Sequence, residues 1–127
     1  MKFVQIGVSS NPKDHVYTAV KDQDIELGLL VEPIPDFQES IKDVYKDIDN
    51  IVVEELAVVH DPSIQNVMLH WTEKHHGCGS VFKQHVNHHG YGEEDIIEVQ
   101  CKAIGINELF DKHNIKELDH LFSDIGS

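Results

Sequence analysis

Two short apolar runs that end abruptly, one in a glycine and the other in a carboxylate, constrain the fold of this chain most strongly. Residues 3–6 run into Gly7, and residues 29–31 run into Glu32, which follows the glycine by 25 positions. Short apolar runs bounded in this way predict buried strands. The interval between them is long enough for the crossover that two parallel strands require. The pattern therefore predicts the first two strands of a parallel α/β sheet.

The residues that end these two strands indicate what the edge of the sheet binds. Gly7 lets the backbone come close to a ligand, and Glu32 can accept hydrogen bonds from ribose hydroxyls, as does the carboxylate about 20 residues after the glycine in dinucleotide folds. The pair therefore predicts a site for an adenosine-like group. The alternative is that Glu32 is a surface carboxylate ahead of the turn-forming Pro33.

Two helices are predicted around the second strand. Residues 9–27 hold the first, which Ser10 or Asn11 can cap and whose apolar face consists of Val16, Ala19 and Val20. The second begins near Pro35 and carries an apolar stripe at a spacing of three and four residues, made of Phe37, Ile41, Val44, Tyr45 and Ile48. Both helices are expected to pack against the sheet.

Further strands are predicted in the rest of the chain, at residues 51–59, 67–71, 96–101 and 118–125. The first of these has a kink or bulge at Glu54–Glu55, and a long loop rich in glycine and histidine separates the next two. Asn107 caps a short helix before the last strand, and Asn114 ends it. The prediction is an α/β fold with a mostly parallel sheet, a strand order of about 3-2-1-4 and a short β extension.

Composition limits the classes of partner and compartment. The chain has 23 acidic and 10 basic residues and a formal net charge of −13, which would repel a phosphate backbone, so no nucleic acid is expected as a partner. With 127 residues, 40% of them hydrophobic, the chain can bury one core, and residues 1–127 are expected to form a single domain. No apolar stretch approaches the roughly 20 residues of a membrane span, and no signal peptide precedes the first strand, so a cytoplasmic location is predicted. Two cysteines are too few for a disulfide framework and are expected to be reduced.

Several blocks, in this order, resemble the FkbM-type S-adenosylmethionine-dependent methyltransferases. They are Phe3–Gly7, Val31–Pro33, Ala57–Val58, Gly77–Val81, Glu98–Val99 followed by Ile106–Leu109, and Ile115–Asp124. The resemblance runs nearly end to end, although no single block is specific. It implies a Rossmann-like methyltransferase sheet, S-adenosylmethionine as cofactor, and O-methylation of a small molecule or glycan.

The same resemblance implies a set of cofactor-binding residues. Gly7 and Glu32 take the adenosine, Ser9 and Ser10 face the methionine carboxylate, and Asp124 faces the methionyl amine. The chain departs from the family in three ways: Asn11 replaces the second glycine after the first strand, the last block lacks its second acid, and the family sheet continues with three further strands. We therefore expect a domain truncated after its fourth strand. The resemblance assigns no catalytic base, and His85 and His88 are the candidates in the long loop.

A cluster of metal-ligand side chains falls in the long loop, at His75, His76, Cys78, His85, His88 and His89. Imidazole and thiolate suit zinc, but only His85 and His89 have the spacing of a structural zinc pair. A solvated loop is the better interpretation, and no metal site is predicted. A metal-binding module and a histidine that transfers protons remain as alternatives.

Three functions of different classes are therefore carried forward. The first is a methyltransferase, or a fragment of one, and the second is a noncatalytic binding or assembly protein on a half methyltransferase fold. The third is a metal-binding module. A nicotinamide-dependent oxidoreductase ranks lower because the glycine-rich pyrophosphate pattern is missing after the first strand. Because residues 118–125 would form an open sheet edge, a homo-oligomer that covers this edge is expected.

Overall fold

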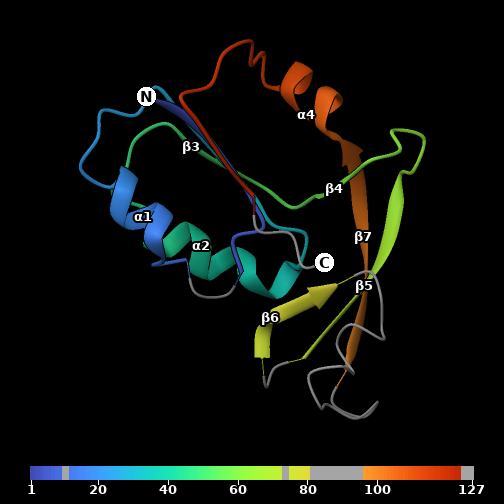
Figure 1. Ribbon diagram of the computed structural model, residues 1–127. Coiled ribbons are helices and arrows are strands. Elements are labelled where there is room, and N and C mark those ends of the chain that lie inside the picture. Colours follow the sequence, from blue (N-terminus) through green and yellow to red (C-terminus); the bar gives the residue numbers. More distant parts are fainter. Residues whose placement is uncertain (10–11, 73–74, 81–95, 124–127) are drawn as a thin grey trace.

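The computed structural model describes the chain except for residues 10–11, 73–74, 81–95 and 124–127, and for residues 72 and 75–80 it describes the backbone alone. In the described part, the strands form two four-stranded sheets, with helices packed around the first (Figure 1). The fold is α/β with a mostly parallel sheet, as predicted.

The first sheet is parallel throughout and contains the two predicted strands that end at Gly7 and Glu32. Its strands are β1 (Lys2–Ile6), β2 (Leu27–Val31), β3 (Ile51–Glu54) and β8 (His120–Ser123), and they lie in the order β3-β2-β1-β8. This order is the predicted one, with the final strand of the chain beside β1. Side chains alternate between the two faces, so that Phe3 and Val4 enter different core clusters.

Helix α1 (His15–Val20) follows β1, but the residue that caps it differs from the prediction. Asp14 Oδ1 accepts hydrogen bonds from the backbone N–H groups of residues 16 and 17, each at 3.0 Å, so Asp14 and neither Ser10 nor Asn11 is the cap. Asp and Asn are equally good caps, and the sequence pattern does not separate them. The other oxygen, Asp14 Oδ2, accepts from the Gln5 amide at 3.0 Å, which ties the helix start to β1.

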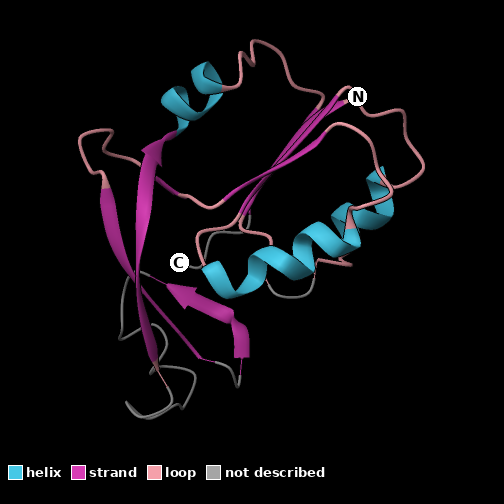
Figure 2. Ribbon diagram, turned by 180° about the vertical axis from the view of Figure 1, so that it is seen from behind, coloured by secondary structure: helices cyan, strands magenta, loops and turns pink. Residues whose placement is uncertain are grey.

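The predicted second helix has two parts, η1 (Pro35–Phe37) and α2 (Gln38–Val44), and a turn leads from α2 to β3. Helices α1 and α2 cover one face of the parallel sheet (Figure 2). The core on this face includes Phe3, Val16, Val20, Leu30, Phe37, Ile41 and Tyr45. Ala19, which the pattern placed on the apolar face, is exposed.

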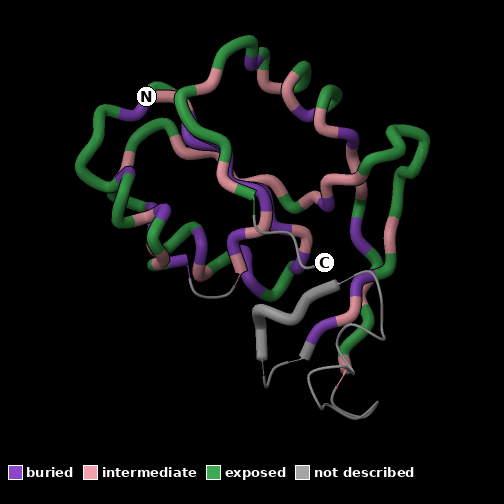
Figure 3. Tube along the Cα trace, viewed as in Figure 1, coloured by how far each residue is buried: buried purple, intermediate pink, exposed green. Residues whose placement is uncertain are grey.

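Helix α4 (Ile106–Lys112) and the segment after it cover the other face. Leu109 and Ile115 pack there against the sheet in a core that also contains Val4, Ile6, Leu29 and Val31. Gly105 is the N-cap of α4, so Asn107 lies within the helix instead of capping it. Asn114, with φ 53°, follows the end of the helix as predicted. The two central strands, β1 and β2, are therefore buried on both faces, whereas the edge strands are more exposed (Figure 3).

The second sheet is mixed and larger than the short extension that the sequence predicted. It consists of β4 (Ala57–Val59), β5 (Asn66–Thr72), β6 (His75–Ser80) and β7 (Ile97–Gly105), in the order β4-β7-β5-β6. β4 runs parallel to β7, whereas β5 is antiparallel to both β7 and β6. Residues 51–59 are thus two strands in two sheets instead of one kinked strand.

One core cluster joins the two sheets. Leu69 and Trp71 from β5 and Cys101 from β7 belong to the same buried cluster as the side chains of α1 and α2. The Trp71 ring lies edge-on to the Phe37 ring, with centroids 5.0 Å apart and an interplanar angle of 75°. The second sheet therefore packs against η1, directly after the carboxyl end of β2.

Candidate functional site

The turn that follows β1 requires a glycine. Gly7 has φ 84°, a left-handed conformation that costs a residue with a Cβ free energy, and its N–H donates to the carbonyl of Val31 at 2.8 Å. Ser9, two residues later, also has a positive φ of 74°. The backbone thus turns sharply at the carboxyl ends of β1 and β2, where ligands bind in open α/β sheets.

Glu32 lies against this turn, and both of its carboxylate oxygens accept backbone hydrogen bonds. Oε1 accepts from Ser9 N–H at 2.7 Å, and Oε2 accepts from Ile34 N–H at 3.1 Å. The residue is only 4% exposed. Burial raises the pKa of the Glu32 carboxyl, and the backbone donors at Ser9, Ile34 and Val8 oppose this shift.

Two side chains that no sequence pattern indicated hold the backbone beside Glu32. The amide of Gln38, at the start of α2, donates to the carbonyls of Glu32 and Ile34. The Cys101 thiol on β7 donates to the carbonyl of Pro33 at 3.1 Å. Burial, together with the nearby Glu55 and Glu32, raises the pKa of Cys101 to about 11, so the thiol stays protonated and can donate. Gln38 is only four to six residues from its acceptors but belongs to no recognised turn or capping pattern, and the Cys101 contact depends on tertiary packing.

The other predicted site residues, Ser10 and Asp124, follow described residues of β1 and β8 closely in the chain. β2 and β3 lie on one side of β1, and β8 lies on the other. The strand order therefore reverses at β1, and open α/β sheets bind ligands at such a switch point. Ile6 is in register with Ser123 of β8, the residue before Asp124. Asp124 and Ser10 themselves lie outside the described residues, so Gly7, Ser9 and Glu32 are the predicted residues that the structure brings together.

The histidine-rich loop is a separate case. The side chains at residues 75–89 lie outside the described part of the chain, and the alternative that they hold a metal stays untested. Among the described residues, no group of three or more His, Cys, Asp or Glu side chains could hold a metal ion. On β5, His70 Nδ1 lies 3.6 Å from Glu98 Oε1 of β7.

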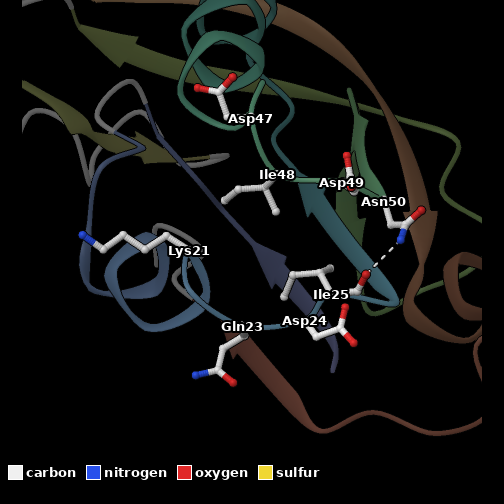
Figure 4. A pocket seen from close by; sticks show the side chains of 8 residues that line it. All are labelled: Lys21, Gln23, Asp24, Ile25, Asp47, Ile48, Asp49 and Asn50. Atoms are coloured by element: carbon white, nitrogen blue, oxygen red, sulfur yellow. Dashed lines mark hydrogen bonds between the residues drawn. The ribbon is translucent and has the colours of Figure 1, made fainter.

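A pocket of about 230 Å³ lies at the opposite end of the parallel sheet. Its lining comes from the segments before β2 and β3, and consists of Lys21, Gln23, Asp24, Ile25, Asp47, Ile48, Asp49 and Asn50 (Figure 4). These residues precede the amino ends of the strands, whereas ligands of parallel sheets bind at the carboxyl ends. This pocket is therefore distinct from the site at Gly7 and Glu32.

A second carboxylate, which is partly buried, lies at the carboxyl end of β3. Glu54 Oε2 contacts Lys112 Nζ at 2.5 Å and His113 Nε2 at 3.2 Å, so the end of α4 is tied to the sheet. Burial alone would raise the pKa of the Glu54 carboxyl, but the hydrogen bonds and charges of Lys112 and His113 lower it overall. A group with a lowered pKa stabilises the fold above its ordinary pKa and loses that contribution in acid.

The contacts of Glu54 with Lys112 and His113 give a prediction for Glu54→Gln. The wild-type free energy of unfolding should fall as the pH drops below about 4.5, and the variant should show a shallower fall. At neutral pH the variant should lose at most about 1 kcal/mol, because Lys112 is half exposed. Urea unfolding at a series of pH values measures both the acid dependence and the loss at neutral pH. Glu55→Gln, at an exposed residue, is the control. Equal acid slopes in wild type and Glu54→Gln would contradict the assignment.

No protein-family model, curated protein or solved structure matches this chain. Within the described residues, no helix combines the length and apolar character needed to cross a membrane. The resemblance to FkbM-type methyltransferases stays a prediction, and the site must be interpreted from its own geometry.

Proposed function

We propose that this chain binds S-adenosylmethionine and is a methyltransferase of the FkbM type or a fragment of one. The observation that carries the proposal is the contact between Glu32 and Ser9, at 2.7 Å, beside the left-handed Gly7. It joins the two predicted elements of a nucleoside site, a glycine turn and a strand-end carboxylate, next to the switch point between β1 and β8.

The residues present fit the adenosine part of that cofactor. A carboxylate has about four acceptor positions, and the two backbone bonds to Glu32 leave two for the hydroxyls of a ribose. Because Glu32 is 4% exposed, a ribose reaches it only if the turn at Ser9 moves and a hydroxyl replaces the Ser9 N–H. The sulfonium cofactor would supply an activated methyl group, and the chain would orient it toward a small-molecule or glycan acceptor.

Thermal unfolding with added ligands tests the proposal. S-adenosylmethionine and its demethylated product, S-adenosylhomocysteine, should each stabilise the chain, by about 2.7 kcal/mol at 100 times Kd. NAD and zinc should not, which separates this proposal from an oxidoreductase and from a metal-binding module. The absence of a shift with either methionine nucleoside would contradict the proposed function. A cytoplasmic location is part of the proposal and accords with the free, buried thiol of Cys101.

One observation favours the second candidate, a noncatalytic binding or assembly protein. Both carboxylate oxygens of Glu32 already accept backbone hydrogen bonds. On this interpretation the role of Glu32 is to hold the turn after β1, and it binds no ligand. In that case methionine nucleosides would not bind, and replacement of Glu32 would affect stability alone.

We also propose that the chain forms a homo-oligomer through β8. In the described residues, β8 pairs only with β1 and lies at the edge of the sheet, and its Leu121 is 51% exposed. An open edge of this kind is a template for pairing with a second chain. The net charge of −13 opposes association, so added salt should strengthen it.

Sedimentation velocity at micromolar concentration should therefore show a dimer or larger species. Leu121→Lys should shift the distribution toward monomer, because a charge at an edge strand opposes pairing. Met68→Lys, at an exposed apolar residue of the other sheet, is the matched control and should leave the distribution unchanged. A wild-type monomer at these concentrations would refute the oligomer.

A further inference from the structure

The three residues after β2, Glu32–Ile34, form a segment that we call the elbow. Each of its carbonyls accepts a hydrogen bond from a side chain outside the elbow. Gln38 Nε2 donates to the carbonyl of Glu32 at 2.7 Å and to that of Ile34 at 3.2 Å. Cys101 Sγ donates to the carbonyl of Pro33 at 3.1 Å. Side-chain donors therefore bond to three consecutive carbonyls, and the carbonyl of Ile34 also accepts from the Phe37 N–H at 3.2 Å.

Gln38 is the more informative of the two donors. It is the first residue of α2 and only 8% exposed, so its amide is removed from water. A buried amide costs free energy unless it is hydrogen bonded, and here the nitrogen makes two bonds, both to the elbow. The amide nitrogen of Gln38 thus stabilises the elbow and makes no bond within α2.

These contacts fix the point from which the Glu32 side chain extends. On one side of the residue its N–H donates to the carbonyl of Glu54 at 3.0 Å, and on the other its carbonyl accepts from Gln38. The backbone of Glu32 is therefore held at both ends, while its carboxylate accepts from the Ser9 N–H in the turn after β1. If a ligand displaces the Ser9 N–H, the bond from Gln38 still holds the backbone from which the carboxylate extends.

We propose that Gln38 is a positioning residue, which orients the Glu32 carboxylate toward the two neighbouring hydroxyls of a nucleoside ribose. This inference rests on the proposed function. A purely structural Gln38 would affect the stability of α2 but would not affect how the chain discriminates between ligands that differ in one ribose hydroxyl. That difference in behaviour provides the test.

The first experiment compares binding of S-adenosylhomocysteine and its 2′-deoxy analogue by isothermal titration calorimetry. The wild type should prefer the ribose form by at least about tenfold, because a hydrogen bond to a charged acceptor is lost in the analogue. Gln38→Met should bring this ratio close to one. Ser40→Ala is the matched control, since Ser40 lies on the same helix and, among the described residues, its Oγ donates to the carbonyl of Phe37, at 3.1 Å, and not to the elbow. Equal weakening of both ligands by Gln38→Met, or no change, would overturn the proposal.

A second experiment needs no ligand and separates this inference from the proposed function. Carboxyl ¹³C NMR follows the titration of Glu32, whose signal is assigned by its loss in Glu32→Gln. Gln38→Met should shift the Glu32 titration, and Ser40→Ala should not. If the wild type binds neither nucleoside, the proposed function fails, and the titration alone decides whether Gln38 positions the carboxylate. An unchanged titration overturns the inference, and Gln38→Leu, which also removes the donor without adding a charge, replaces the methionine variant if the latter does not fold.

Discussion

Replacement of Glu32 by glutamine should weaken binding of S-adenosylhomocysteine by about 100-fold, while the chain stays folded. Hydrogen bonds from hydroxyls to a charged acceptor contribute about 1.5–3 kcal/mol each, and the amide offers only one acceptor oxygen and no charge. Glutamine nearly matches glutamate in shape, so the packing around the elbow should persist. Calorimetric titration measures the loss, and Glu39→Gln, at an exposed residue of α2, should bind like the wild type.

The stability of this variant should also depend on pH in a defined direction. The raised pKa of the Glu32 carboxyl means that the folded chain holds the proton more tightly than the unfolded chain. This contribution to stability is complete below the ordinary pKa of 4.5 and is lost as the pH rises through the raised value. Glu32→Gln does not titrate, so its unfolding free energy should fall less than that of the wild type over this range. Wild-type affinity in the variant would show that Glu32 only holds the turn.

Replacement of Trp71 by alanine should have the largest effect on stability. Trp71 is 3% exposed and packs edge-on against Phe37 at the junction of the two sheets. Truncation of a buried tryptophan to alanine costs about 3–5 kcal/mol, a large share of the 5–15 kcal/mol that stabilises an ordinary domain. Urea unfolding followed by circular dichroism should show this loss, since the variant lacks the one tryptophan whose fluorescence reports on folding.

Trp71→Phe is the matched control because it keeps an aromatic ring opposite Phe37. An edge-on ring pair contributes about 0.5–1.5 kcal/mol beyond its burial, so the phenylalanine variant should retain more stability than the alanine variant. If Trp71→Ala lost less than about 1 kcal/mol, the packing between the second sheet and η1 would not stabilise the fold as described.

The strands of the parallel sheet were predictable from the sequence. In the second sheet β5 and β7 were predicted as strands, but the four-stranded pairing was not. The runs that end at Gly7 and Glu32 carry a local signal, because a strand buried on both faces is apolar along its whole length. Residues 51–59 carry the same signal, yet they divide between two sheets at Glu55 and Leu56. The division depends on the partners, since β3 pairs with β2 whereas β4 pairs with residues 103–105 of β7. Local patterns do not specify partners so distant in sequence.

The candidate site shows the same limit. The nearness of Gly7, Ser9 and Glu32 follows from the parallel order of β1 and β2, because the carboxyl ends of neighbouring parallel strands meet at one edge. The roles of Gln38 and Cys101 do not follow from any pattern. A glutamine on a helix and a cysteine in a strand are ordinary residues. The bond from Gln38 depends on how the chain turns between β2 and α2, and the bond from Cys101 arises only when β7 packs beside the elbow.

The pairing of β8 with β1 has a consequence for the order in which the chain folds. Lys2 N–H donates to Asp119 Oδ2 at 2.7 Å, and Asp119 N–H donates to the carbonyl of Lys2 at 2.9 Å, so contacts join residues more than a hundred positions apart. On the ribosome, β1 emerges early but lacks this neighbour until residues 119–123 have been made. The switch point of the sheet can therefore form only after residue 123 has been made, and closure of so long a loop slows folding. Until then the open side of β1 is exposed to other chains, and the proposed nucleoside site is incomplete.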